Sequence, residues 1–175
     1  MAGQSITPAL TGWGWPSAKP APRREPGFLV TPACYNRGLK KLTAKQVREI
    51  LPKMAFNKLL GMRLVSTHKD GVTIEVAVTP QMMNGAGVLH GGVTATMADA
   101  AAGIATNRQL GGERSITTVE LKINYFRPVT KGRVRARSYL IRVGSTLVIS
   151  RVDLTDSEKK LIGTALVTYM VLGTR

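Results

Sequence analysis

The sequence predicts an α+β domain in which an antiparallel sheet wraps one long central helix. Two observations predict it. Short segments with alternating apolar and polar residues mark six strands, whereas residues 84–107 are rich in alanine and glycine and resemble a helix. The segments follow the order helix, two strands, long helix, four strands. That order offers few parallel crossovers and therefore favours antiparallel pairing.

Residues 1–42 are predicted to be an irregular, basic tail, and residues 43–175 the folded domain. Six of the nine prolines and both tryptophans lie within residues 1–38, without clean periodicity. The tail is nearly free of acidic residues, as targeting peptides are, but it has no apolar core segment and little amphipathic pattern. Its prolines argue against a helix-turn-helix DNA-binding head.

The charge balance indicates an anionic ligand. The net charge is +15, and residues 1–45 hold seven basic residues and one acidic residue, so most of the excess lies in the domain. Such a surface attracts nucleic acid, anionic lipid or phosphate-bearing small molecules. The sequence has no run of eighteen apolar residues, so it does not predict a membrane-spanning helix. Cys34 is the single cysteine and His68 and His90 are the only histidines, so we expect no disulfide, no structural metal and a cytoplasmic location.

The domain is expected to begin with a helix. Thr43 is a plausible N-cap, and Gln46 three residues later completes a capping box. Pro52 is expected to interrupt the helix. The apolar residues that share its predicted face are Val47, Ile50, Leu51 and Met54.

The strands are bounded by turn signals. Residues 62–68 and 71–79 alternate and are separated by Lys69-Asp70-Gly71, in which Asp-Gly is a hairpin turn signal. The later strands are expected at residues 115–126, 133–143, 145–154 and 161–171. In the first of these, alternation predicts one face with Thr117, Val119, Leu121, Ile123 and Tyr125 and the opposite face with Thr118, Glu120, Lys122 and Asn124.

The long helix carries one acid among small and apolar residues. Gly91 and Gly92 permit a tight turn at its start, and its apolar residues extend nearly all the way round, which predicts a helix enclosed by protein. Asp99 lies about two turns into this helix, where an unpaired carboxylate costs several kcal/mol. Asp99 is therefore either a hydrogen-bonded structural acid or a nucleophile or general base in a shielded pocket.

The start of the same helix suggests a second catalytic group. The free N–H groups of a helix N-terminus, at the positive end of its dipole, can stabilise a developing oxyanion. His90, just before the glycines, is either a capping residue or a participant in chemistry. An oxyanion donor and a carboxylate on one helix together indicate acyl transfer.

The spacing of Asn84, His90, Gly91, Gly92 and Asp99 resembles the signature of the hotdog-fold acyl-CoA thioesterases, in particular the phenylacetyl-CoA (PaaI-like) branch. The similarity extends from about Leu59 to Leu172 and includes the segments INYFRPV and DLTDSEKKLIGTA. A related branch has Glu where this chain has Asp99, which makes the Asp-type branch the better match. The resemblance does not name an acyl group.

The resemblance implies a homodimer whose protomers join into a continuous double sheet, often paired again to a tetramer. It also implies active sites between protomers and no cofactor beyond the CoA of the substrate. Asp99 would attack or activate water, and Gly91 N–H would polarise the thioester. Asn84 would hold the water or the carbonyl, and His90 would support the loop and contact the thioester region. Thr118, or its neighbour Thr117, would face the partner's acid. We also expect the compensation of Asp99 to come from across the subunit boundary, so that an isolated protomer would be inactive.

The basic residues near one strand have two interpretations. One strand carries four alternating cations, Lys131, Arg133, Arg135 and Arg137, and Arg127 precedes them. They either form a solvated face that discourages aggregation or, in part, receive the phosphates of CoA, for which Arg108 is a weaker candidate. The residues expected to line the acyl pocket, together with residues of the partner, are Leu59, Leu60, Met82 and Met83.

Three functions remain open from the sequence. A thioester hydrolase that converts an aryl-acetyl-CoA or a medium- or long-chain acyl-CoA to free acid and CoA accounts for the most residues. A non-catalytic acyl-CoA sensor or nucleic-acid partner would use the positive charge, although residues 1–42 do not resemble a DNA-reading head. A dehydratase on the same fold would need a different arrangement of Asp and His.

Overall fold

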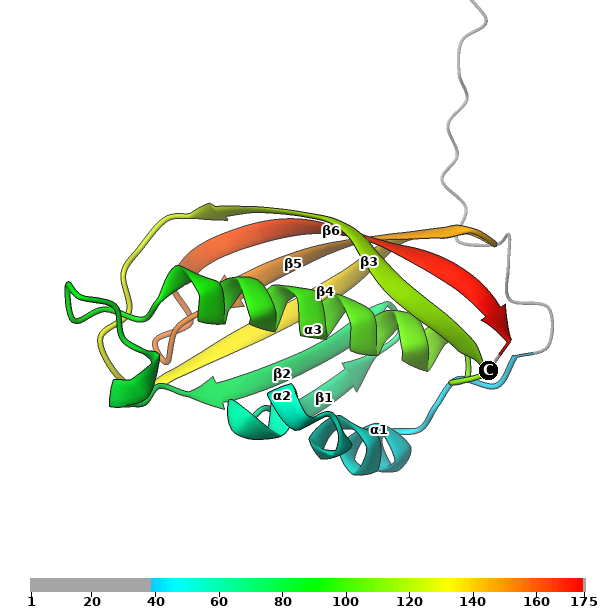
Figure 1. Cartoon of the computed structure of the whole chain (residues 1–175), viewed down its shortest axis with the longest axis horizontal. Helices are drawn as coiled ribbons and strands as arrows, with labels where there is room; N and C mark the ends of the chain where they lie inside the picture. Colours follow the sequence, from blue (N-terminus) through cyan, green and yellow to red (C-terminus); the bar gives the residue numbers. More distant parts are fainter. Residues whose placement is uncertain (1–38, 175) are drawn as a thin grey trace, which may run out of the picture.

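The computed structural model describes residues 39–174, and the predictions for residues 1–38 lie outside this range. The alternating segments form a six-stranded antiparallel sheet in the described chain, as predicted. The strands are β1 (Arg63–His68), β2 (Gly71–Ala77), β3 (Arg114–Tyr125), β4 (Arg133–Val143), β5 (Leu147–Thr155) and β6 (Leu161–Thr174). Their spatial order is β1-β2-β4-β5-β6-β3, and the sheet curves around the central helix α3 (Gly91–Gln109) (Figure 1).

The local signals before the sheet are confirmed. Thr43 caps α1 (Ala44–Ile50): its hydroxyl accepts from the Gln46 N–H at 3.3 Å, and the Gln46 side chain accepts from the Thr43 N–H at 2.9 Å. Pro52 lies in the 3-10 turn η1 (Leu51–Lys53), where the chain turns into α2 (Ala55–Leu59). Leu42 already hydrogen-bonds the Arg108 carbonyl, so contacts with the domain begin just before the predicted boundary.

The hairpin between β1 and β2 forms at the predicted turn, with His68 opposite Gly71. A side chain at Gly71 would collide with the Ser138 carbonyl of the neighbouring strand β4, which explains the glycine by close backbone approach. After β2, the 3-10 turn η2 (Pro80–Met82) leads into the loop before α3. No helix among residues 39–174 is long and apolar enough to span a bilayer.

The helix α3 is enclosed on one side only. Four of its alanines pack on the sheet and are at most 1% exposed, which confirms close packing by small side chains; they are Ala98, Ala101, Ala102 and Ala105. Thr96, Asp99 and Gly103, in contrast, are only partly buried. The prediction of a fully enclosed helix was therefore wrong on the Asp99 side, because α2 and β3 stand far enough from this side to leave a cavity.

Candidate active site

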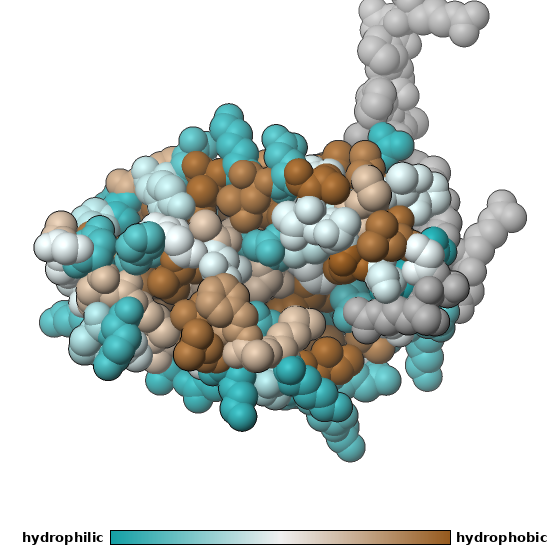
Figure 2. Space-filling view, in the orientation of Figure 1, coloured by the Kyte–Doolittle hydropathy of each residue, from teal (hydrophilic) through white to brown (hydrophobic). Residues whose placement is uncertain are grey.

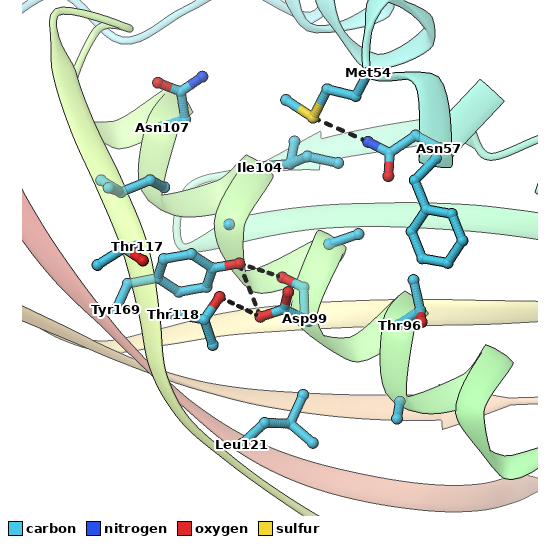
Figure 3. Close-up of a pocket in the computed structure, with 15 residues that line it drawn as sticks. Met54, Asn57, Thr96, Asp99, Ile104, Asn107, Thr117, Thr118, Leu121 and Tyr169 are labelled. Carbon is cyan, nitrogen blue, oxygen red and sulfur yellow. Dashed lines mark hydrogen bonds between the residues drawn. The ribbon is translucent and has the colours of Figure 1, made fainter. Parts of the chain in front are cut away.

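A cavity of about 650 Å³ lies between α3, α2, β3 and β6 (Figure 3). In Figure 2, apolar surface is exposed on this face of the molecule, and the exposed apolar side chains on and near α2 include Met54, Phe56 and Leu59. Asp99 is the one acidic side chain that lines the cavity. The cavity is otherwise mostly apolar, so an ionised Asp99 needs specific partners.

Two hydroxyl groups of the same chain supply those partners. The Thr118 hydroxyl donates to Asp99 Oδ1 at 2.9 Å, and the Tyr169 hydroxyl lies 2.9 Å from Oδ1 and 3.1 Å from the Asp99 backbone oxygen (Figure 3). The expectation that compensation comes from across a subunit boundary was therefore wrong. Because both side chains contact Oδ1, the second carboxylate oxygen, Oδ2, remains for a ligand or water in the cavity.

Thr118 reaches Asp99 because β3 contains a bulge. The pairing with β6 shifts between Thr118, opposite Tyr169, and Glu120, opposite Thr168, so Val119 is the extra residue. A bulge reverses the alternation of faces along a strand. Thr118 therefore shares the inner face with Leu121, and both line the cavity, whereas simple alternation predicted opposite faces. In addition, Thr118 faces the acid of its own chain rather than the partner's.

Tyr169 was not identified from the sequence. It lies 70 residues after Asp99, opposite Thr118 in the sheet, and its side chain is 7% exposed. Burial, together with the charge of Asp99, raises the pKa of Tyr169 well above its usual value, so the hydroxyl stays protonated and acts as a donor. The available signal was the alternation of β6, which places Tyr169 on the same face as buried Val167 and Val171, where a tyrosine hydroxyl needs a partner.

The start of α3 leaves one N–H group free. His90 is the N-cap, and its Nδ1 accepts from the Gly92 N–H at 2.9 Å. The Tyr125 hydroxyl donates to the Gly91 carbonyl at 3.0 Å. Among the described residues nothing accepts from the Gly91 N–H, which agrees with its predicted role as an oxyanion donor. The Asn84 oxygen accepts from the N–H groups of Ala86 and Val88, at 3.0 and 3.3 Å, and so shapes its own loop.

The two predicted catalytic groups are far apart within one chain. Gly91 and Asp99 are eight positions apart on one continuous helix, which is about 12 Å along the axis. Asn84, His90 and Gly91 do not line the Asp99 cavity. One thioester carbonyl therefore cannot contact the Gly91 N–H and the Asp99 carboxylate of the same chain.

The predicted phosphate-binding cations fall in different places. Arg133 and Arg135 donate to Glu75 at 3.0 and 2.9 Å on the outer face of the sheet, opposite to α3, because Val134 between them is buried in the core. Arg127 and Lys131 are exposed after β3, and Arg127 lines a small hollow with Tyr125, near the start of α3. The remaining candidates, Arg108 and Arg137, bind the His68 carbonyl and Asp70 respectively.

The predicted pocket wall lies elsewhere in the chain. Leu59, Leu60 and Met82 line a second cavity of about 550 Å³ beside α2 and η2. Met83 pairs with Leu89 in an isolated bridge of the loop before α3. In the described chain, the apolar residues around Asp99 are instead Met54, Phe56, Ile104, Ile116 and Leu121. Thr117 also lines this cavity, beside Thr118.

Comparisons with known proteins agree with this arrangement. A family model described as the thioesterase superfamily matches residues 86–162. The medium/long-chain acyl-CoA thioesterase YigI of Escherichia coli is 31% identical over 150 residues, which cover 74% of this chain and 97% of that protein. A solved thioesterase of Haemophilus influenzae is 26% identical with a TM-score of 0.71, over 77% of this chain and 94% of that chain.

A third comparison bears on the predicted branch. The solved PaaI protein of Escherichia coli is 22% identical with a TM-score of 0.68, over 74% of this chain and 94% of that chain, and this likeness shows the fold alone. Three findings establish the family: the match that covers 97% of the acyl-CoA thioesterase YigI, the match to the family model, and the sheet wrapped around one helix. The chain belongs to the hotdog-fold acyl-CoA thioesterases of the thioesterase superfamily.

Proposed function

We propose that this chain hydrolyses an acyl-CoA ester to the free acid and CoA, with Asp99 as the nucleophile or general base. The observation that carries the proposal is the state of the Asp99 carboxylate: two hydroxyl donors fix Oδ1 and leave Oδ2 in a largely apolar cavity. If Asp99 acts as a base, it takes a proton from water, the water oxygen bonds to the carbonyl carbon, and the carbon–sulfur bond breaks as the CoA thiolate leaves and receives that proton. If Asp99 attacks the carbonyl carbon itself, the same carbon–sulfur bond breaks and an acyl-Asp99 anhydride forms. A water molecule then hydrolyses the anhydride, which frees Asp99 and the acid and supplies the proton for the CoA thiolate.

The second half of the site is proposed to come from a partner protomer. Because about 12 Å of helix separates Gly91 from Asp99, the Gly91 N–H that polarises the carbonyl belongs to the other chain of a homodimer. His90 supports this arrangement by occupying the Gly92 N–H and leaving that of Gly91 available. Asn84 lies in the same loop, and its amide N–H₂ is proposed to hold the attacking water or the carbonyl.

The acyl group is proposed to be apolar, in the medium- or long-chain or aryl-acetyl class. The apolar lining of the Asp99 cavity supports this class, as does the name of the Escherichia coli relative. The PaaI-like branch remains our proposal on the basis of Asp99 and its spacing from Asn84. We propose that Arg127 and Lys131 bind the phosphates of CoA, because both are exposed. Arg133 and Arg135 are less suited to this role, because both already pair with Glu75.

The proposal predicts that Asp99→Asn abolishes thiol release while the protein stays folded. The asparagine oxygen can still accept from Thr118 and Tyr169, so the change removes the charge and basicity with little change of shape. We expect kcat to fall by about a thousandfold or more, measured by thiol release across short, medium, long and aryl-acetyl CoA esters.

A matched control is Asp153→Asn, which changes a carboxylate that binds Thr164 and Arg151, away from the cavity. Its kcat should equal that of the wild type. Unaltered thiol release by Asp99→Asn would refute the role of Asp99. If the wild type released no thiol from any ester but bound duplex DNA with a steep salt dependence, a non-catalytic nucleic-acid partner would replace the enzyme.

A further inference from the structure

Tyr125 stands beside the free N–H group at the start of α3. It is the last residue of β3, opposite Gly163 of β6, and follows Gly91 by 34 residues. Its hydroxyl donates to the Gly91 carbonyl at 3.0 Å. This contact joins the end of the sheet to the first residue of the helix, and the hydrolysis proposed above gives it no role.

The ring of Tyr125 also lies against the backbone of Gly91. A Cβ added to Gly91 would lie 3.2 Å from Tyr125 Cζ and 3.3 Å from its hydroxyl oxygen, closer than an ordinary van der Waals contact. Because Gly91 has no side chain, the ring can approach this closely. The ring covers this side of Gly91 and keeps water away from it, although Tyr125 as a whole is 54% exposed.

The peptide group between Gly91 and Gly92 is held at both ends. Its N–H, which belongs to Gly92, donates to His90 Nδ1 at 2.9 Å. Its carbonyl, which belongs to Gly91, accepts from the Tyr125 hydroxyl and from the Thr94 hydroxyl, the latter at 2.8 Å. Glycine has more conformational freedom than any other residue, so these contacts restrict a residue that has no side chain to restrict it.

Of the two hydroxyl donors to Gly91, only Tyr125 comes from outside the helix. Thr94 lies in the first turn of α3 and moves with it, whereas Tyr125 belongs to β3. The first N–H groups of a helix have no acceptor within it, and an oxyanion donor is effective only when its direction is set before the charge develops. The Tyr125 hydroxyl therefore fixes the first residue of α3, with its free N–H, relative to the sheet.

The same strand also holds the other reacting group. Thr118 of β3 contacts Asp99, and Tyr125, seven residues further along β3, contacts Gly91. In a site shared between two protomers, β3 of each chain thus sets the position of the acid in one site and of the N–H donor in the other.

We propose that Tyr125 is a positioning residue for the hydrolysis, because its hydroxyl fixes Gly91 and so directs the Gly91 N–H at the thioester carbonyl. This inference rests on the proposed function. Tyr125 acts through Gly91 and not on the reacting atoms. Negative charge builds up on the carbonyl oxygen in the transition state, so a misdirected N–H lowers kcat and leaves KM nearly unchanged.

Tyr125→Phe removes the hydroxyl and keeps the ring. We expect kcat for thiol release to fall about tenfold, which is less than the loss of an entire oxyanion donor causes, with KM close to that of the wild type. Tyr139→Phe is the matched control: it makes the same change on β4, where the ring lies under Arg137 and Arg151, and should keep the wild-type kcat. Tyr125→Leu also removes the ring that covers Gly91 and should lose at least as much kcat as Tyr125→Phe.

The stretching frequency of the thioester carbonyl separates positioning from simple structural support. Asp99→Asn is used to bind an acyl-CoA, isotopically labelled at that carbonyl, without hydrolysing it. Infrared difference spectroscopy should show a lower frequency for the bound than for the free ester, because the Gly91 N–H polarises the carbonyl. Adding Tyr125→Phe should return the frequency part of the way to that of the free ester, and adding Tyr139→Phe should leave it unchanged.

Two sets of outcomes separate this inference from the proposed function. A wild-type kcat for Tyr125→Phe, or a carbonyl frequency that the added Tyr125→Phe leaves unchanged, would overturn the role of Tyr125 and leave the hydrolase intact. A lower Tm with either result would show that the hydroxyl serves stability alone. Absence of thiol release by the wild type from every acyl-CoA would refute the hydrolase itself.

Discussion

At the scale of single residues, Asp99 shows how a chain keeps an acid on a helix of small apolar side chains. Its carboxylate accepts from Thr118 and Tyr169 through one oxygen. The tyrosine remains neutral because burial raises its pKa, so it donates without adding a competing negative charge. The arrangement fixes the orientation of the reactive oxygen, and the two hydrogen bonds offset the desolvation of the partly buried carboxylate.

Tyr169→Phe removes one of these two donors. We expect kcat to fall by about tenfold and the free energy of unfolding by about 1 kcal/mol, because Asp99 loses a neutral hydrogen bond that holds its carboxylate. Thiol release and urea denaturation measure the two effects. Tyr139→Phe is the control, since that ring lies under Arg137 and Arg151, outside the cavity. A Tyr169→Phe variant with wild-type kcat would show that the hydroxyl does not position Asp99.

Asp70 predicts a pH dependence of stability. Desolvation disfavours its ionised form, but the hydrogen bond and charge of Arg137, at 2.6 Å, outweigh this and lower the pKa of Asp70 below its ordinary 3.8. A lowered pKa means that the stabilisation is complete above the unfolded-state pKa and is lost as the pH falls through the folded-state value. The Tm difference between wild type and Asp70→Asn should therefore be constant from about pH 7 to pH 5 and shrink below about pH 4. A difference that stays constant in acid would contradict the contribution of this ion pair.

At the scale of elements, signals within a few residues were enough to predict individual helices and turns. The arrangement of the site instead depends on pairing between strands that are distant in the sequence. Thr43 with Gln46, and Asp70 with Gly71, act within a few residues, so the capped helix and the hairpin were predictable. The bulge at Val119 depends on the register between β3 and β6, which nothing within β3 reveals. The meeting of Tyr169 with Asp99 depends on strand order, and the all-round small residues of α3 did not indicate which side faces the cavity.

Gly103 links α3 to β6, and Gly103→Ala tests that link. Alanine normally stabilises a helix by about 1 kcal/mol relative to glycine. Here a Cβ would lie 2.5 Å from the Tyr169 hydroxyl oxygen and 2.9 Å from Cζ, so the tyrosine must move away from Asp99. We expect lower stability in urea denaturation and about a tenfold loss of kcat. The loss of kcat should be smaller in a Tyr169→Phe background, because the hydroxyl contact is already absent.

The control for this prediction is Gly173→Ala, where an added Cβ meets no atom within 4 Å. It should leave kcat and stability close to those of the wild type. A fully active, stabilised Gly103→Ala would instead show that the tyrosine moves without consequence.

At the scale of the whole molecule, the two parts of the proposed active site lie at two separate places on the described chain. The acid lies in the middle of α3, and the free N–H lies at its start. β3 is an edge strand with large exposed apolar residues along and just after it, namely Val119, Tyr125 and Phe126 at 48%, 54% and 51% exposure. An edge of this kind favours pairing with a second chain, and pairing through β3 would bring the second chain close to the Asp99 cavity.

Complementation between two inactive variants tests this shared site. Asp99→Asn lacks the acid, and Gly91→Pro lacks the proposed N–H donor. Proline suits the backbone at Gly91 because this is the first residue of α3 and the preceding His90 is extended, with φ −61° and ψ 132°. Its added Cβ would lie 3.2 Å from the ring of Tyr125, so this exposed side chain must shift by a few tenths of an ångström. We expect each homodimer to lose at least about a hundredfold in kcat. In a heterodimer, however, one site combines the intact Asp99 of one chain with the intact Gly91 of the other.

Heterodimers are obtained by co-expressing the two variants with different affinity tags and purifying on both. One of the two sites is intact in each, so thiol release should return to about half of the wild-type rate. A heterodimer of Asp99→Asn with Asp99→Ala, purified in the same way, is the control and should stay inactive because neither chain supplies the acid. If the heterodimer with Gly91→Pro were also inactive, although its mass shows one copy of each chain, Asp99 and Gly91 would not act across the interface. Recovery to half activity requires that they do, since within one chain the helix keeps them about 12 Å apart.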